Sequence, residues 1–248
     1  MSARLAVVSD IHGNLPALVA VSADIQRFGV ERVVDLGDSL SGPLWPAETA
    51  QFLRDRGWPA LAGNHERQLL ACARERGGPS DQFAFEAVSP GVREWLAARP
   101  ATMWTGEGIL ACHGTPASDD TYLLETVDAN VGGGLRAATR EEAGARLSGV
   151  AARLVLCGHS HVPRLVRLDD GRLVLNPGSV GVPAYEDDAG VRHVVANGSP
   201  HARYAIVDLG PDDVEVVQRL VAYPWWEAVE RARRNGREDY CRWLTGWP

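Results

Sequence analysis

Eight side chains in this 248-residue sequence have the types and spacing of a metal-binding hydrolytic site. They comprise five of the seven histidines, two aspartates and one asparagine, and each lies at or just after the end of a short apolar run. The set is Asp10, His12, Asp38, Asn64, His65, His113, His159 and His161. Imidazole binds Zn, Fe, Mn or Ni, whereas carboxylate and amide oxygens suit harder divalent ions. The mixture predicts one or two transition-metal ions that bind oxygen anions.

The chemistry expected of such a site is an in-line displacement at an anionic ester. Two ions about 3.5–4 Å apart can clamp the oxygens of that displacement. One carboxylate must bridge them, and we assign Asp38 because it follows a glycine and lies between the other ligand loops in sequence. A single Zn already lowers the pKa of bound water to about 7, so a water shared by two cations loses a proton readily. The site is expected to carry its own hydroxide nucleophile.

The apolar runs that precede these residues predict the strands that position them. Each run is apolar at consecutive positions, which is typical of strands buried on both faces. The runs cover residues 5–9, 32–36, 59–62, 108–112, 154–157 and 173–175. Open α/β sheets collect their sites on loops at strand ends, so the polar side chains are expected to converge there.

Helical patterns separate the runs, and the chain ends in two strands and two helices. The expected helices cover 14–28, 47–56, 66–76, 90–98, 139–147, 225–235 and 238–244. Strands are expected at 202–209 and 214–221 with a turn at 210–213, and surface loops at 128–134 and 186–200. No boundary interrupts the motifs over 10–179. We therefore expect a single domain over 1–248, with C-terminal strands and helices in 202–248.

Five motif blocks occur in the order of a known superfamily. They are Asp10-x-His12, Gly37-Asp38, Gly63-Asn64-His65, His113-Gly114 and Gly158-His159-Ser-His161. This series resembles the calcineurin-like metallophosphoesterase superfamily, in its small bacterial and archaeal phosphodiesterase branch. The resemblance implies a four-layer α/β/β/α sandwich, in which two mixed β-sheets are flanked by helices and the site lies at the loop ends.

The resemblance also implies a role for each matching residue. Asp10, His12 and His161 would hold one metal. Asn64, His113 and His159 would hold the second, and Asp38 would bridge the two. His65 would not be a ligand but would face the substrate and protonate the leaving oxygen or stabilise the phosphoryl charge. The implied protein is a dinuclear metal-dependent phosphoesterase, with phosphodiesters favoured as substrates and manganese favoured over iron, zinc or nickel.

Four other residues have two interpretations each. Asn14 could hold phosphate or cap the helix that follows it. Glu66 could orient His65, but its place in a first helical turn favours the macrodipole interpretation. Asn176 and Ser179, in a block Asn-Pro-Gly-Ser that also resembles the superfamily, could contact substrate or support the ligands. The pocket wall is expected to come from 40–45, 115–122 and 180–185.

Two alternative functions stay open. Protein serine/threonine phosphatases and diadenosine polyphosphate hydrolases share the Asp10 to Asn14 block and the Gly-Asn-His-Glu66 block. They carry Asp-Arg-Gly after the Gly-Asp block, where this sequence has Ser41-Gly-Pro43. The other alternative is a non-catalytic scaffold with this fold. It predicts that some metal-ligand residues are replaced, whereas every ligand type is present here.

Composition limits the partners. The 32 acidic residues outnumber 25 basic ones, giving a net charge of -7. Binding to a nucleic-acid duplex requires a basic face, so no such partner is expected. No run reaches the roughly 18–20 apolar residues of a membrane helix. Without a secretory segment or a CxxC pair, the four cysteines indicate the cytoplasm. The expected partner is a small phosphate ester, and a homo-oligomer remains possible.

Overall fold

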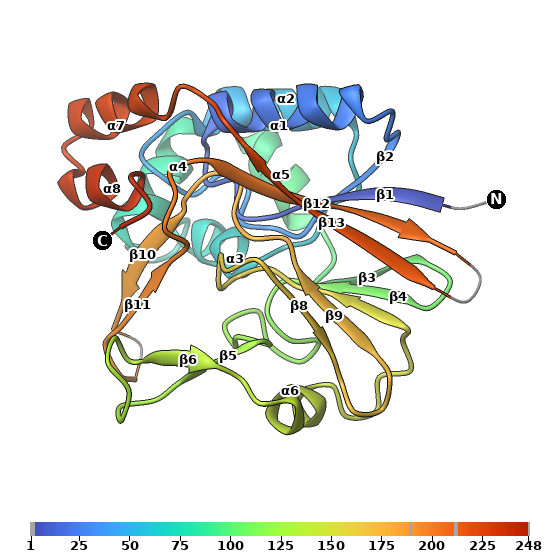
Figure 1. Cartoon of the computed structure of the whole chain (residues 1–248). Helices are drawn as coiled ribbons and strands as arrows, with labels where there is room; N and C mark the ends of the chain where they lie inside the picture. Colours follow the sequence, from blue (N-terminus) through green and yellow to red (C-terminus); the bar gives the residue numbers. More distant parts are fainter. Residues whose placement is uncertain (1–2, 189, 211–212, 248) are drawn as a thin grey trace.

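The computed structural model of the chain describes residues 3–188, 190–210 and 213–247, and two mixed β-sheets form its centre. The first sheet has the order β13-β12-β1-β2 and the second β3-β4-β7-β9-β8 (Figure 1). The first comprises β1 (Ala3–Val8), β2 (Arg32–Asp35), β12 (Ala202–Leu209) and β13 (Val214–Val221). The second comprises β3 (Thr102–Gly106), β4 (Ile109–Cys112), β7 (Leu154–Leu156), β8 (Arg164–Arg167) and β9 (Leu173–Asn176). Strands β1 and β2 are parallel, as are β4, β7 and β9.

The two sheets pack face to face through alternate side chains. Along β1, Leu5 and Val7 pack into a cluster with Leu154 and Leu156 of the second sheet. The intervening Ala6 and Val8 face helices on the other side. This alternation follows from the two-residue period of a strand. Burial on both faces explains why the sequence of β1 is apolar at consecutive positions.

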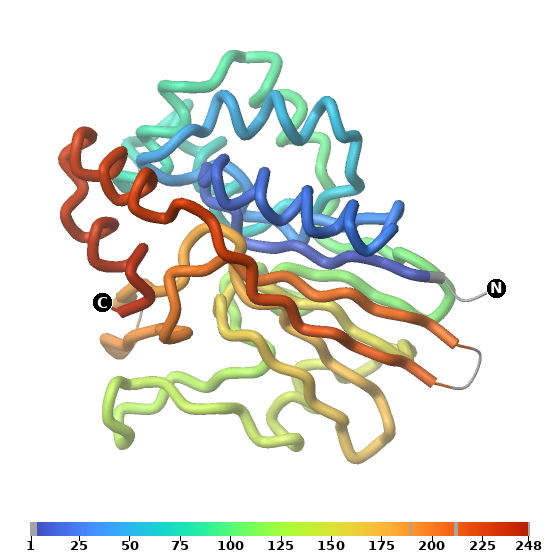
Figure 2. The backbone as a smooth tube through the Cα atoms, turned by 45° about the horizontal axis from the view of Figure 1, so that its top comes forward, coloured from blue at the N-terminus to red at the C-terminus, as the bar shows by residue number. Residues whose placement is uncertain are grey.

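Helices cover the outer face of each sheet, and a helix pair closes one end (Figures 1 and 2). The first sheet is covered by α1 (Leu15–Arg27), α2 (Pro46–Arg56), α3 (Asn64–Ala71), α4 (Pro79–Ala87) and α5 (Pro90–Ala97). The second is covered by the single short helix α6 (Arg140–Arg146). The pair α7 (Trp225–Arg234) and α8 (Glu238–Trp243) packs on Leu44 and Val182. The predicted α/β/β/α layering is confirmed, with a thin fourth layer. Within the described ranges no helix is long and apolar enough to cross a membrane.

Several expected elements were wrong. The segment 186–200 was expected as a loop, but β10 (Ala184–Asp187) and β11 (His193–Ala196) pair as a hairpin that takes in part of it. The run 59–62 forms only an isolated bridge between Asp35 and Ala60. The helix expected over 66–76 ends at Ala71.

Other elements were not foreseen from the sequence, among them strands β3 and β8. Helix α4 is one of them, and it begins at Pro79, because proline suits a first helical turn. A small hairpin pairs β5 (Glu125–Val127) with β6 (Leu135–Ala137), and the expected loop 128–134 connects them. The turn expected at 210–213 includes 211–212, which lie outside the described residues.

Candidate metal centre

The predicted ligand residues meet at one edge of the sandwich, where strands of both sheets end. They are Asp10 and His12 after β1, Asp38 after β2, Asn64 and His65 at the start of α3, His113 after β4, and His159 and His161 after β7. His65 and His159 are partly exposed, and the other six side chains are buried. The carboxyl ends of parallel strands share one edge of a sheet, which explains why residues distant in sequence converge here.

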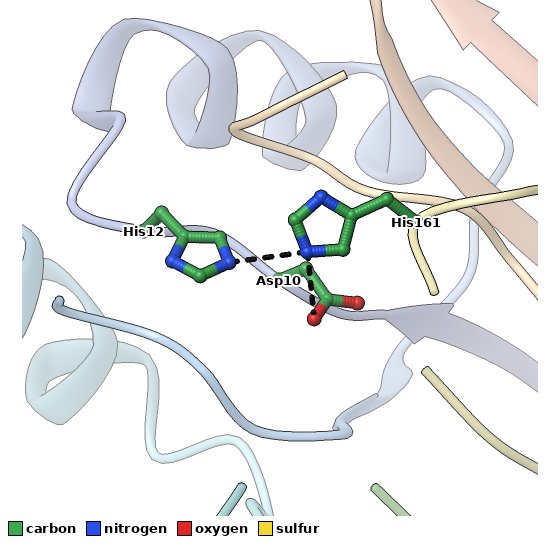
Figure 3. Close-up of side chains that lie close together, drawn as sticks. All are labelled: Asp10, His12 and His161. Atoms are coloured by element: carbon green, nitrogen blue, oxygen red, sulfur yellow. Dashed lines mark hydrogen bonds and ion pairs between the residues drawn. The ribbon is translucent and has the colours of Figure 1, made fainter. Parts of the chain in front are cut away.

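One group of possible metal ligands consists of Asp10, His12 and His161 (Figure 3). Each imidazole donates its Nδ1 proton to a backbone carbonyl, His12 to Ser41 and His161 to Val182. In the neutral rings both Nε2 atoms therefore present lone pairs, and they lie 3.2 Å apart. Asp10 Oδ1 is 3.3 Å from His161 Nε2 and has no hydrogen-bond partner. Three buried electron-pair donors without a proton between them fit a cation.

The second group consists of Asp38, His113 and His159. His113 donates from Nδ1 to the carbonyl of Leu36, so its Nε2 faces the site. Asn64 Oδ1 lies 3.0 Å and Asp38 Oδ2 lies 3.1 Å from that nitrogen. This is again a set of converging acceptor atoms, and the residues present fit a second divalent ion.

The two groups adjoin, and burial prepares their histidines for metal binding. His113 Nε2 is 3.9 Å from Asp10 Oδ1 of the first group. Burial lowers the pKa of His12 and of His159 to about 4, so both rings are neutral near pH 7, as ligation requires. Burial also lowers the pKa of His113, but the charge of Asp38 and their hydrogen bond outweigh it and raise that pKa to about 10. A proton on His113 thus balances the carboxylates, a task that a bound cation can take over.

Backbone strain marks the same residues. Asp10, His12, Asp38, His159 and His161 have φ between 50° and 66°, and they are the non-glycine residues with positive φ in the described chain. The left-handed region costs an L-residue roughly 1–2 kcal/mol. Such strain persists where the surrounding structure enforces it, and it clusters at functional sites. All five strained residues belong to the two ligand groups.

A comparison with known families agrees with this geometry. The family model described as the calcineurin-like phosphoesterase superfamily domain matches residues 3–199. The chain belongs to this superfamily. The chain is 25% identical over 261 residues to an uncharacterized protein of Methanocaldococcus jannaschii, covering 95% of this chain and 94% of that protein. Members of the superfamily typically use divalent metals, which the two ligand groups fit.

Solved structures share its fold. A metallophosphoesterase from Sphaerobacter thermophilus superposes with a TM-score of 0.74 at 23% identity, covering 98% of this chain and 99% of that one. A putative diadenosine tetraphosphatase superposes with a TM-score of 0.52 at 14% identity, covering 87% and 93%. The similarity to the Sphaerobacter thermophilus structure extends over the C-terminal strands and helices, which follow the family match that ends at residue 199.

The carboxylate that orients the ring of His65 is Asp81 of α4, not Glu66. His65 Nδ1 donates to Asp81 Oδ1 over 2.7 Å. Glu66 is buried and accepts instead from the backbone N–H groups of Asp38, Ser39 and Gly63. The interpretation of Glu66 as a partner of His65 was therefore wrong. Asp81 lies 16 residues from His65 on a helix that was not predicted, and no local motif indicated it.

Glu66 instead joins two segments that carry candidate ligands. Its carboxylate holds the loop of Asp38 and the start of α3 together, and Arg99 Nη1 lies 3.5 Å away with its side chain 5% exposed. We expect Glu66→Gln to lower the free energy of unfolding by about 3 kcal/mol, because it removes the nearer of the two buried carboxylates beside Arg99, the other being Asp35 at 3.8 Å. Denaturant unfolding measures this. Glu94→Gln on the exposed face of α5 is the control and should change it by less than about 0.5 kcal/mol. A similar small change for both variants would contradict the role of Glu66.

Asn14 lies beneath the site and uses all of its polar atoms within the protein. Its Oδ1 accepts from Ala17 N at the start of α1, which is the capping interaction that was one of its two interpretations. Its Nδ2 donates to the carbonyl of Gly181 and to Tyr223 Oη. The side chain is fully buried and does not line the cavity beside the metal centre.

Asn176 and Ser179 hold the backbone of the ligand segments. Asn176 Nδ2 donates to the carbonyl of Gly158, directly before His159. Ser179 Oγ donates to the carbonyl of Asp10. Both side chains are buried behind the ligands and outside the cavity lining.

A cavity of about 510 Å³ opens beside the candidate metal centre. Part of its wall is formed by candidate ligand residues and His65. The rest comes from the start of α4, from β10 and from α8. Of the segments expected to form the wall, 180–185 contributes Val182 and Tyr185, whereas 40–45 and 115–122 do not line it. The error arose because α4 and α8 reach the site only through tertiary packing.

Proposed function

We propose that the protein is a dinuclear metal-dependent phosphodiesterase that hydrolyses small phosphate esters. The observation that carries the proposal is the pair of adjoining ligand groups at one edge of an open cavity. Of their five strained residues, His12, Asp38, His159 and His161 line that cavity, and Asp10 is buried behind them. Superfamily membership supports phosphoester hydrolysis. The finer assignment to diesters is supported by the charge of the cavity wall.

The ligand residues divide between two ions as the family motif implies. Asp10, His12 and His161 would hold one ion. Asn64, His113 and His159 would hold the other, with Asp38 between them. When bound, such ions polarise phosphoryl oxygens and lower the pKa of water so that a nucleophile is available at neutral pH. We favour manganese, with iron, zinc or nickel as alternatives that the same donor types accept.

His65 is the residue that we assign to the leaving group. Burial lowers the pKa of His65, but the charge of Asp38 and the hydrogen bond to Asp81 outweigh it and raise the pKa to about 9. The ring therefore carries its proton at neutral pH, and it lines the cavity. Cations beside Asp38 would offset the contribution of that carboxylate, whereas the contribution of Asp81 would remain. His65 can thus donate a proton to a departing alkoxide.

The rest of the cavity wall favours a substrate with little negative charge. It carries the carboxylates of Asp81, Glu186, Asp187, Asp188 and Asp239. Arg237 pairs with Asp239, Arg192 with Glu186 and His65 with Asp81, so the acidic groups still outnumber the basic ones. Like charges repel, and the repulsion grows with each charge on the substrate. A phosphodiester of uncharged or cationic alcohols is therefore favoured over a dinucleoside polyphosphate, and the acidic wall does not favour a nucleic-acid duplex.

Initial rates on paired chromogenic substrates test the proposal. The protein is stripped of metal, Mn²⁺ is added back, and bis(p-nitrophenyl) phosphate is compared with p-nitrophenyl phosphate and a diadenosine polyphosphate. We expect activity that depends on Mn²⁺ and is fastest on the diester. Preference for the monoester would indicate a phosphatase, and preference for the polyphosphate a dinucleoside hydrolase. Two bound ions with no rate on any substrate would indicate a non-catalytic scaffold.

A further inference from the structure

Two tyrosine rings lie against ligand histidines of the two separate groups. The ring of Tyr122 packs on His159, with centroids 4.7 Å apart and the planes tilted by 32°. The ring of Tyr185, on β10, meets His161 edge to face at the same centroid distance of 4.7 Å. Each tyrosine ring therefore packs against one ligand of a different proposed ion.

A chain of hydrogen bonds connects these tyrosines to the metal-binding segment. Tyr185 Oη donates to the carbonyl oxygen of His159 over 3.0 Å. Tyr122 Oη lies 2.8 Å from Tyr185 Oη and 2.9 Å from Nε2 of His193 on β11. His193 is 2% exposed, and its Nδ1 donates to the carbonyl of Val191, which fixes the ring. The β10–β11 hairpin is thus joined to the ligand segment by polar contacts as well as by packing.

The ligand segment needs such support because two of its residues are strained. His159 and His161 have φ of 66° and 54°, a region that costs a non-glycine residue roughly 1–2 kcal/mol. Tyr185 fixes the peptide carbonyl of one strained residue and packs on the ring of the other. Neither tyrosine contributes an atom to either ligand group.

We propose that Tyr122, Tyr185 and His193 form a clamp that holds His159 and His161 in the metal-binding conformation and sets the affinity of the ion bound by His159. The inference rests on the proposed dinuclear centre. These are positioning residues: they act on the ions through the histidines. Groups that orient metal ligands typically change metal affinity by 10–100-fold when they are removed.

The test is a Mn²⁺ titration of the metal-stripped full chain, by calorimetry and by electron paramagnetic resonance. Wild type should bind two ions and show the signal of a coupled Mn pair. Tyr185→Phe keeps the ring against His161 but removes the hydroxyl that holds His159. We expect the ion held by His159 to bind about 10–100-fold more weakly in this variant, whereas the affinity of the other ion changes little. At a Mn²⁺ concentration that fills both sites of the wild type, the signal of the coupled pair should therefore be lost.

Tyr204→Phe is the matched control. Tyr204 is fully buried on β12, and its hydroxyl donates to Asp24 on α1 over 2.9 Å, outside the metal centre. This variant loses a buried tyrosine hydrogen bond of the same kind, so it measures the general cost to stability. It should keep wild-type affinity for both ions.

The outcomes separate the clamp from the metal centre. If Tyr185→Phe binds both ions as tightly as Tyr204→Phe does, the clamp is refuted while the dinuclear centre stands. If wild type binds fewer than two ions, the proposed function fails and the clamp with it. Should Tyr185→Phe not fold, Tyr122→Phe takes its place, because it removes the contacts to both Tyr185 and His193. Unchanged binding of the second ion in that variant overturns the proposal.

Discussion

Asp38→Asn is expected to lose bound metal and hydrolytic activity together. Asp38 is buried, its Oδ2 lies 3.1 Å from His113 Nε2, and its position between the motif blocks makes it our bridging ligand. Asparagine has no charge to offset that of the cations, and its amide group can direct a donor at them. Metal chemistry contributes several kcal/mol to such reactions, which corresponds to roughly 10²–10³-fold or more in rate. Metal content after desalting and kcat on the diester measure both effects.

The same substitution leaves the backbone undisturbed, which makes its result interpretable. Asparagine tolerates the left-handed region, so φ of 57° at position 38 can be kept. Asp208→Asn is the control, because Asp208 pairs with Arg4 on the surface of the first sheet. It removes one carboxylate without touching the site and should keep full activity. An Asp38→Asn protein with both ions and normal kcat would show that Asp38 is not a ligand.

Much of the candidate metal centre could be predicted because its residues follow strands. Asp10 and Asp38 follow two parallel neighbours in one sheet, and His113 and His159 follow two parallel neighbours in the other. A buried parallel strand leaves a consecutive apolar run in the sequence, so the polar residues at its end are visible without a structure. Their convergence then follows from the shared edge, and the family motif adds the order of the blocks.

The rest depends on contacts that no local pattern encodes. Strand β12, near the end of the chain, pairs with β1 at its start. Strand β4 and its neighbours therefore form a second sheet instead of extending the first one. The β10–β11 hairpin lies in a segment that we predicted as a loop, and its Tyr185 contacts His159 and His161, which are distant in sequence. Asp81 and Arg237 reach the cavity only because α4 and α8 pack beside it. These contacts join residues that are far apart in sequence, so they arise from tertiary packing.

His65→Ala is expected to keep both ions while losing about 10²–10⁴-fold in kcat, the usual worth of a general acid. The side chain of His65 is in neither ligand group, and its backbone N–H, which donates to Asp38 Oδ1, survives the substitution. The loss should be larger for a diester with an alkyl alcohol than for bis(p-nitrophenyl) phosphate, because p-nitrophenolate departs without a proton. An equal loss on both esters would assign His65 to charge stabilisation instead of proton transfer.

Asp81→Asn tests whether the carboxylate of Asp81 sets the pKa of His65. The carboxylate of Asp81 raises the pKa of His65, so the wild-type rate should fall as pH rises through that pKa, where the acid loses its proton. Without that carboxylate the pKa is lower, and the fall should move to lower pH while the ions stay bound. In the double variant Asp81→Asn/His65→Ala, the cost of the second substitution should largely disappear, because Asp81 acts through His65. If the losses in kcat of the two single variants add in the double variant and the pH profile does not move, Asp81 stabilises α4 and takes no part in the reaction.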